Sequence, residues 1–306
     1  MTTFASSYLD SADADPQGTA TLARDYMRHC IDRNDVLTAE QRQRLGGWLG
    51  PELFNVLAPG GVASTANWLD SPASLDGLIG RNHGPAGPAI DITADSGLSW
   101  ADGIVGTVNE DVRGIQEGTV VRLASTAAAA HAIDCMSEAM TLLRRAWPEA
   151  AVETSVLVSN YVYVSGADYR SGAMHRYFGC MLVGTGYVTS VERAYETLLH
   201  ETGHTVLYLK SSFCRYLNNP DERAVHPLRR EPRPMLGTLH AAISLYRVAR
   251  GFSKLLGTGF ESLEAERILA RNSADLGTAL RVLAEHADWT ASGERFYDSM
   301  RRELDL

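Results

Sequence analysis

Two histidines, His200 and His204, stand four residues apart in the run His-Glu-Thr-Gly-His, inside a segment whose apolar residues recur at helical spacing. Side chains four residues apart project from the same face of an α-helix, so both imidazoles would lie at metal-chelating distance. The segment from about 190 to 209 is predicted to be an amphipathic helix that opens with a capping box formed by Thr189 and Glu192. These features predict a metalloenzyme built around this helix.

A glycine within the motif, Gly203, costs about 1 kcal/mol relative to alanine in a helix interior. Its presence therefore predicts the close approach of another backbone or of a ligand. The alternative interpretation of the motif is a pair of hydrogen-bonded, half-buried structural histidines with Glu201 on the surface.

The chain is acidic, with 28 Lys and Arg against 37 Asp and Glu, a formal charge of -9. This balance argues against nucleic acid and anionic membranes as partners. No apolar run approaches the roughly 18 residues of a membrane span, and residues 1–20 lack the apolar region of a secretory signal. Cys30, Cys135, Cys180 and Cys214 lack Cys-x-x-Cys spacing, which indicates reduced thiols. We expect a soluble, cytoplasmic protein.

The expected fold is α+β, mainly helical, with a small antiparallel sheet beside the helix that carries the histidines, and it is not a cupin barrel. Residues 1–118 are expected to form helices followed by a Gly- and Pro-rich loop region, and residues 119–306 the metal-binding catalytic core, the two making one continuous unit. Helices are predicted at 20–57, 125–147, from 238 to just before Gly257, 261–273 and 275–288, and strands at 119–123, 155–158, 161–164 and 177–183.

A third protein ligand is needed to complete a catalytic metal site, with open positions left for water or substrate. His240 is the better candidate because it lies near the start of a predicted helix, directly after a turn-forming stretch. A helical glutamate, as in many HExxH peptidases, is the alternative, and the candidates are Glu261, Glu264 and Glu266.

A proline-stiffened basic segment, residues 227–234, leads into the helix that carries His240. Arginines near a helix N-terminus oppose the macrodipole, so a bound anion would relieve the conflict. Arginine also pairs with a carboxylate through two parallel hydrogen bonds. The segment therefore indicates a carboxylate-bearing small molecule beside the metal. The alternative is a solvated basic loop paired with Asp221, Glu222 and Glu231.

The two blocks of sequence form one pattern: His200-Glu201-x-x-His204, then Pro227-x-Arg229-x-x-Pro232-Arg233-Pro234-x-x-Gly237-x-Leu239-His240-Ala241. The pattern resembles the HExxH-motif family of peptide-modifying proteins found with ribosomally made natural products (RiPP biosynthesis). The resemblance covers roughly residues 175–255 and departs from the family pattern at Leu228, where we expect tryptophan.

The resemblance implies an iron(II)- and 2-oxoglutarate-dependent dioxygenase that hydroxylates a side-chain carbon of a ribosomal precursor peptide. It implies that His200, His204 and His240 bind the metal, and that Arg229 and Arg233 hold the distal carboxylate of 2-oxoglutarate. Three protein ligands would leave three octahedral positions for the keto acid and dioxygen. Glu201 would supply a carboxylate ligand, or would position water or substrate.

A zinc hydrolase is the main alternative function, with Glu201 as general base for a metal-bound water. A non-catalytic protein that binds a metal or a peptide is a third possibility. The two arginines and His240 favour the oxygenase, whereas a glutamate as third ligand would favour the hydrolase.

Overall fold

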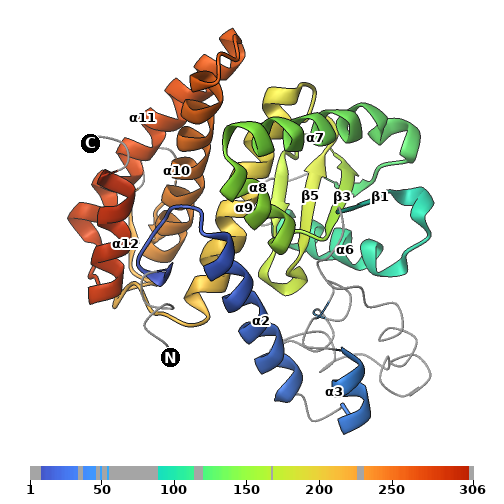
Figure 1. Ribbon diagram of the computed structural model, residues 1–306, viewed down its shortest axis with the longest axis horizontal. Coiled ribbons are helices and arrows are strands. Elements are labelled where there is room, and N and C mark those ends of the chain that lie inside the picture. The colour runs from blue at the N-terminus through green and yellow to red at the C-terminus, as the bar shows by residue number, and fades with distance from the viewer. Residues whose placement is uncertain are drawn as a thin grey trace. The chain divides into compact units, whose positions relative to one another are not determined.

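The computed structural model describes residues 8–33, 37–45, 49, 54, 89–113, 120–166, 168–225 and 231–302, without the side chains of residues 99 and 111–113. This part of the chain is mostly helical, with short strands between the helices (Figure 1). The expected α+β, mainly helical class is therefore confirmed. Among the described residues, the strands form one open sheet and one separate two-stranded pair, and no cupin barrel closes.

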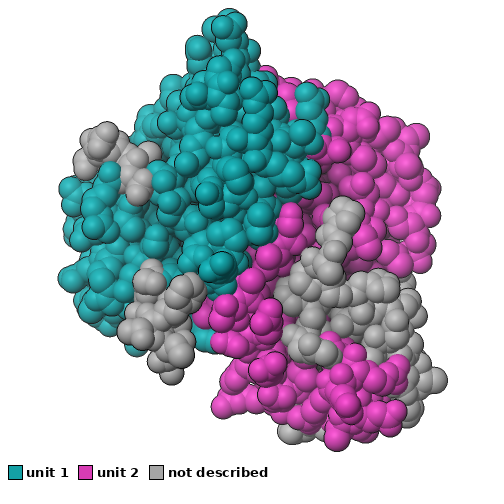
Figure 2. All heavy atoms as spheres, viewed as in Figure 1, with its two compact units in different colours: residues 1–19, 138–153, 195–306 teal, residues 20–137, 154–194 magenta. Residues whose placement is uncertain are grey.

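The chain divides into two compact units (Figure 2). Unit 1 comprises residues 1–19, 138–153 and 195–306, and unit 2 comprises residues 20–137 and 154–194. The expected boundary between residues 118 and 119 lies among residues 114–119, outside the described part. The N-terminal stretch through Thr19 groups with the C-terminal helices and not with the residues that follow it.

The sheet of unit 2 has a parallel core. Strands β3 (Asn160–Ser165) and β5 (Cys180–Gly184) run parallel, and β1 (Ile90–Ile92) lies parallel on the other side of β3. The short strands β2 (Arg122–Leu123) and β4 (Ser171–Ala173) pair antiparallel with β3 and β5. The expected antiparallel pairing of the segments that became β3 and β5 is therefore wrong. Their continuous, buried apolar runs are the pattern that parallel strands show.

The helices of the first half are α2 (Pro16–Asp32), α3 (Ala39–Leu45), α6 (Ser99–Arg113) and α7 (Thr126–Ala146). Short 3-10 turns cover Ala94–Ser96 and His175–Tyr177. Helix α6 lies in the stretch expected to be loop, residues 59–118, of which 59–88 and 114–118 fall outside the described residues. Its buried residues Ala101, Ile104, Val105 and Val108 follow helical spacing and pack in one cluster with the strands.

Helix α8 (Pro148–Leu157) includes most of the segment 155–158, so the strand expected there is wrong. Proline is favoured in the first turn of a helix, where its missing N–H has no partner to lose. The helical backbone bonding then continues past the end, since the Val158 N–H donates to the carbonyl of Thr154 at 2.8 Å. The β-branched residues of this segment are therefore part of the helix that begins at Pro148 and do not form a strand.

The C-terminal half of unit 1 is helical. Helix α9 (Val191–Ser211) matches the predicted motif helix, and α10 (Met235–Gly257), α11 (Leu263–His286) and α12 (Ala291–Arg302) follow it. Strands β6 (Arg223–Ala224) and β7 (Arg233–Pro234) form an antiparallel pair directly before α10. Apolar residues of α10, α11 and α12 share one buried core.

The break expected between residues 273 and 275 is wrong, because α11 is continuous there. Asn272 lies next to the expected break, and its side chain is buried, with Nδ2 donating to the carbonyl of Ile268 and to Glu196. Helix α12 was not predicted. Thr290 begins it, with its Oγ1 accepting from the Gly293 N–H at 3.1 Å.

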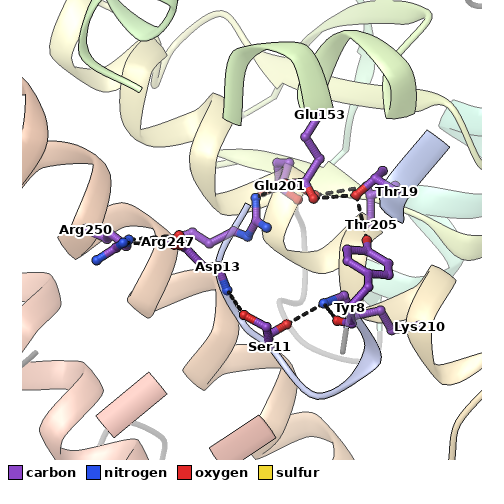
Figure 3. A network of polar contacts seen from close by, with 10 residues as sticks. All are labelled: Tyr8, Ser11, Asp13, Thr19, Glu153, Glu201, Thr205, Lys210, Arg247 and Arg250. Atoms are coloured by element: carbon purple, nitrogen blue, oxygen red, sulfur yellow. Dashed lines mark hydrogen bonds and ion pairs between the residues drawn. The ribbon is translucent and has the colours of Figure 1, made fainter. Parts of the chain in front are cut away.

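A buried polar network joins distant parts of unit 1 (Figure 3). Arg247 of α10 pairs with Glu153 of α8, and both side chains are 0% exposed. Thr19 donates a hydrogen bond to the same carboxylate. Lys210, at the end of α9, donates to the carbonyls of Tyr8 and Ser11. The N-terminal segment is thus bound to α9 and α10 by polar contacts as well as by apolar packing.

In the described part of the chain, no helix combines the length and the hydrophobicity needed to cross a membrane. None of the four cysteines forms a disulfide, and three are buried while Cys214 is partly exposed. The expected burial of these thiols is confirmed, and their reduced state stays a prediction.

Candidate metal centre

Helix α9 presents both motif histidines on a single partly exposed stripe. Its cap is Ser190, whose Oγ accepts from the Arg193 N–H at 3.3 Å, and not the expected Thr189. Between residues 194 and 210, every residue is buried except His200, His204 and Tyr208. These three residues are spaced by four, so they share one face of the helix. The imidazoles therefore lie at the margin of the core, as predicted.

The structure brings the three predicted ligand histidines into contact. Nε2 of His204 lies 3.2 Å from Nε2 of His200, and Nδ1 of His204 lies 3.3 Å from Nδ1 of His240. Two nitrogens that each lie about 2.1 Å from one ion are roughly 3.0 to 3.4 Å apart. Each separation, taken by itself, therefore fits two neighbouring ligands of one metal ion in donor type and in spacing.

The three donor nitrogens do not converge on one point, because His204 uses a different ring nitrogen toward each neighbour. Accordingly, the described residues contain no group of three His, Cys, Asp or Glu side chains already arranged around a single ion position. The pair His200 and His204 fits a metal as it stands, and His240 is the adjacent third imidazole. Metal binding by the three remains a prediction.

The protonation state of His204 suits metal binding. Burial holds the pKa of His204 well below its usual value, and the nearby His200, His240 and Arg233 lower it further. A neutral imidazole is the form that donates a lone pair to a metal. At neutral pH, His204 is therefore in its ligand form.

The glutamates considered as alternative third ligands do not join the histidines. Glu261 precedes α11, and Glu264 and Glu266 lie in its first turn, directly after the turn that ends α10. At 1.5 Å per residue, the C-terminal end of α10 is about 25 Å from His240. Among these candidate third ligands, His240 is the one that the fold brings into contact with a motif histidine.

Gly203 explains how α9 and α10 come this close. A Cβ on Gly203 would lie 3.0 Å from Cα of Ser244 and 3.2 Å from its Oγ, so a side chain at this crossing would require the α10 backbone to move away slightly. The predicted close approach of another backbone is confirmed. Ser244 lies one turn beyond His240, and Gly203 is adjacent to His204, so the same contact sets the distance between the backbones that carry these two imidazoles.

Replacing Gly203 with alanine is expected to destabilise the fold and weaken metal binding together. Alanine gains about 1 kcal/mol of helix propensity, but overpacking against the α10 backbone costs about 1–3 kcal/mol. Denaturant unfolding and metal titration would measure both effects. Gly277→Ala is the matched control, because Gly277 lies in the interior of α11 and a Cβ there meets nothing within 4 Å. An equal stability gain in both variants would contradict the packing argument.

Arg233 lies close enough to His204 to lower the pKa of that residue. It belongs to β7, which runs directly into α10 and so links this arginine to His240. Arg229, the second predicted carboxylate-binding residue, lies outside the described residues.

Glu201 is 3% exposed, whereas both flanking motif histidines are partly exposed. Figure 3 includes this residue beside the buried polar network, where its backbone carbonyl accepts from the Thr205 hydroxyl at 2.9 Å. Its predicted roles, as ligand, base or positioning residue, remain predictions.

The sequence reasoning missed Tyr208. Its ring packs against that of His240, with centroids 4.6 Å apart. The signal was present, because Tyr208 follows His204 at the same four-residue step that relates the two motif histidines.

No protein-family model matches the chain, and a search of the curated proteins finds no match. The resemblance to the HExxH-motif peptide-modifying family rests on the residues that carry it and remains a prediction.

Proposed function

We propose that this protein is an iron(II)- and 2-oxoglutarate-dependent dioxygenase that hydroxylates a side-chain carbon of a ribosomally made peptide. The observation that carries the proposal is the contact of His204 with both His200 and His240 on two crossing helices. A set of three imidazoles on one side of an ion leaves positions open for small ligands.

Each residue of the cluster has a distinct part in the proposal. The imidazoles of His200, His204 and His240 hold the metal, and Arg233 binds the distal carboxylate of 2-oxoglutarate through charge-assisted hydrogen bonds. Arg229 is proposed for the same carboxylate from the resemblance alone. Glu201 orients water or substrate from its buried position.

The bound iron and 2-oxoglutarate would supply the oxidising chemistry: one oxygen atom of dioxygen enters the new hydroxyl group and the other enters succinate, with release of carbon dioxide. The chain's own residues bind and orient these groups. A cytoplasmic location is part of the proposal, and the absence of disulfides among the four cysteines agrees with a reducing compartment.

The test is an anaerobically reconstituted assay that measures succinate release with a co-encoded peptide, with and without iron(II) and 2-oxoglutarate. We expect turnover to need both and the peptide to gain the mass of one oxygen atom. Cleavage of a peptide bond without either cofactor would overturn the proposal in favour of the zinc hydrolase. Metal content alone does not decide, because zinc binds nitrogen sites more tightly than iron(II).

Replacing Arg233 with alanine is expected to raise the KM for 2-oxoglutarate by roughly 10- to 100-fold, the value of one hydrogen bond to a charged group. Lysine at this position should restore only part of the lost affinity for 2-oxoglutarate, because lysine cannot form two parallel hydrogen bonds with a carboxylate. Arg267→Ala removes an exposed charge on α11 and serves as the control. Equal KM values for the variants at 233 and 267 would remove Arg233 from the carboxylate site.

A further inference from the structure

Tyr208 completes the row of rings at the candidate metal centre. It is the third member of the partly exposed stripe on α9, one turn beyond His204. Its ring meets His240 of α10 at 4.6 Å between centroids and 49° between planes. The next ring contact, between His204 and His240, spans 5.5 Å at 35°. His240 therefore contacts two rings of α9, that of His204 and that of Tyr208 one turn further along the helix.

The ring contact with Tyr208 restrains the orientation of the His240 imidazole. His240 belongs to a different helix from the other two imidazoles, and the α9–α10 crossing at Gly203 fixes the backbones but not the rotation of the imidazole. Aromatic pairs at this separation attract each other beyond the effect of their buried area, by a factor of about 2 to 13 in the balance between two ring orientations. That is enough to favour one ring orientation over its alternatives.

We propose that Tyr208 is a positioning residue for His240, holding its imidazole beside His204, with the two Nδ1 atoms 3.3 Å apart, next to the motif pair. This inference rests on the metal binding of the proposed function. Groups that orient metal ligands contribute about 10- to 100-fold to metal affinity. The positioning effect comes from the ring of Tyr208 and not from its hydroxyl group, so a phenylalanine at this position should keep the effect.

The experiment is a calorimetric titration of the full chain, purified free of metal, with cobalt(II), accompanied by the visible spectrum of the bound cobalt. Tyr208→Leu is expected to weaken binding by roughly 10-fold or more and to change the cobalt spectrum. Tyr208→Phe should bind within about threefold of the unaltered chain, since it keeps the ring contact. The melting temperature of each metal-free variant shows whether it is folded.

The matched control is Tyr297→Leu, which removes a ring contact of similar length, 5.1 Å to Trp289, elsewhere in unit 1. It should leave cobalt affinity unchanged. If Tyr208→Leu binds cobalt as tightly as the unaltered chain, the positioning role is overturned while the proposed function stands. If the unaltered chain shows no saturable binding, both are overturned.

Discussion

Replacing His204 with alanine is expected to lower metal affinity by at least about 100-fold, more than the loss of an orienting group costs. His204 is the one motif residue that contacts both other imidazoles, at 3.2 Å and 3.3 Å. Its removal leaves His200 and His240 on separate helices without the ring between them. A single imidazole on each side is a poor binding site for a divalent ion.

Thermal unfolding offers an independent measurement of the same loss. A metal at 100 times its Kd stabilises the folded state by about 2.7 kcal/mol, so cobalt(II) or zinc(II) should raise the melting temperature of the unaltered chain. His204→Ala should show no such rise. His286→Ala, at the exposed end of α11, is the control and should keep it. A metal-dependent rise in His204→Ala equal to that of the control would remove His204 from the ligand set.

The motif helix was predictable because its apolar spacing and its glycine each reflect a local physical requirement. Helical periodicity gave α9 to within about two residues. Gly203 has an unfavourable helix propensity that only a close contact explains, and the contact with Ser244 is present. The cap differed by one residue, Ser190 in place of Thr189, because both side chains can accept from the first turn.

The errors lie where tertiary packing decides between local alternatives. Parallel pairing of β3 and β5 depends on burial of both faces, which a short apolar run does not specify. The continuity of α11 through Asn272 depends on Glu196, a partner on another helix. Helix α8 ends in β-branched residues. These residues are helical because the helix that begins at Pro148 continues through them.

The candidate site also has a part that the sequence predicts and a part that only the structure shows. The pairing of His200 with His204 follows from helical geometry alone. His240 was predicted as the third ligand from its place near the start of a predicted helix and from the resemblance, but no local signal fixes which part of α9 it contacts. The contact with Tyr208 needs the antiparallel crossing of α9 and α10, and it became visible only in the structure.

The buried network of unit 1 was also beyond prediction, because its members come from four distant parts of the sequence (Figure 3). Burial lowers the pKa of Lys210 to about 7. Burial alone would lower the pKa of Arg247 too, but the charge and hydrogen bond of Glu153 raise it above its usual value. Arg247 is therefore a permanent buried cation whose main neutralising partner is Glu153.

Replacing Glu153 with glutamine is expected to lower the free energy of unfolding by about 3–5 kcal/mol, the cost of leaving a buried charge without its partner. Both side chains are 0% exposed, so water cannot take the place of the carboxylate. Glutamine keeps the size of the side chain, and the loss therefore reports charge and not a cavity. Urea unfolding followed by circular dichroism would measure it.

Two further variants distinguish the stability effect of the buried ion pair from that of the groups around it. Glu149→Gln changes an exposed carboxylate of the same helix and should cost less than about 0.5 kcal/mol. Glu153→Leu combined with Arg247→Met removes both charges, and should recover most of the stability lost in Glu153→Gln, because an apolar pair carries no desolvation penalty. If the double variant were as unstable as Glu153→Gln, the hydrogen bond from Thr19 and the packing around Trp147, and not the buried cation, would account for the role of Glu153.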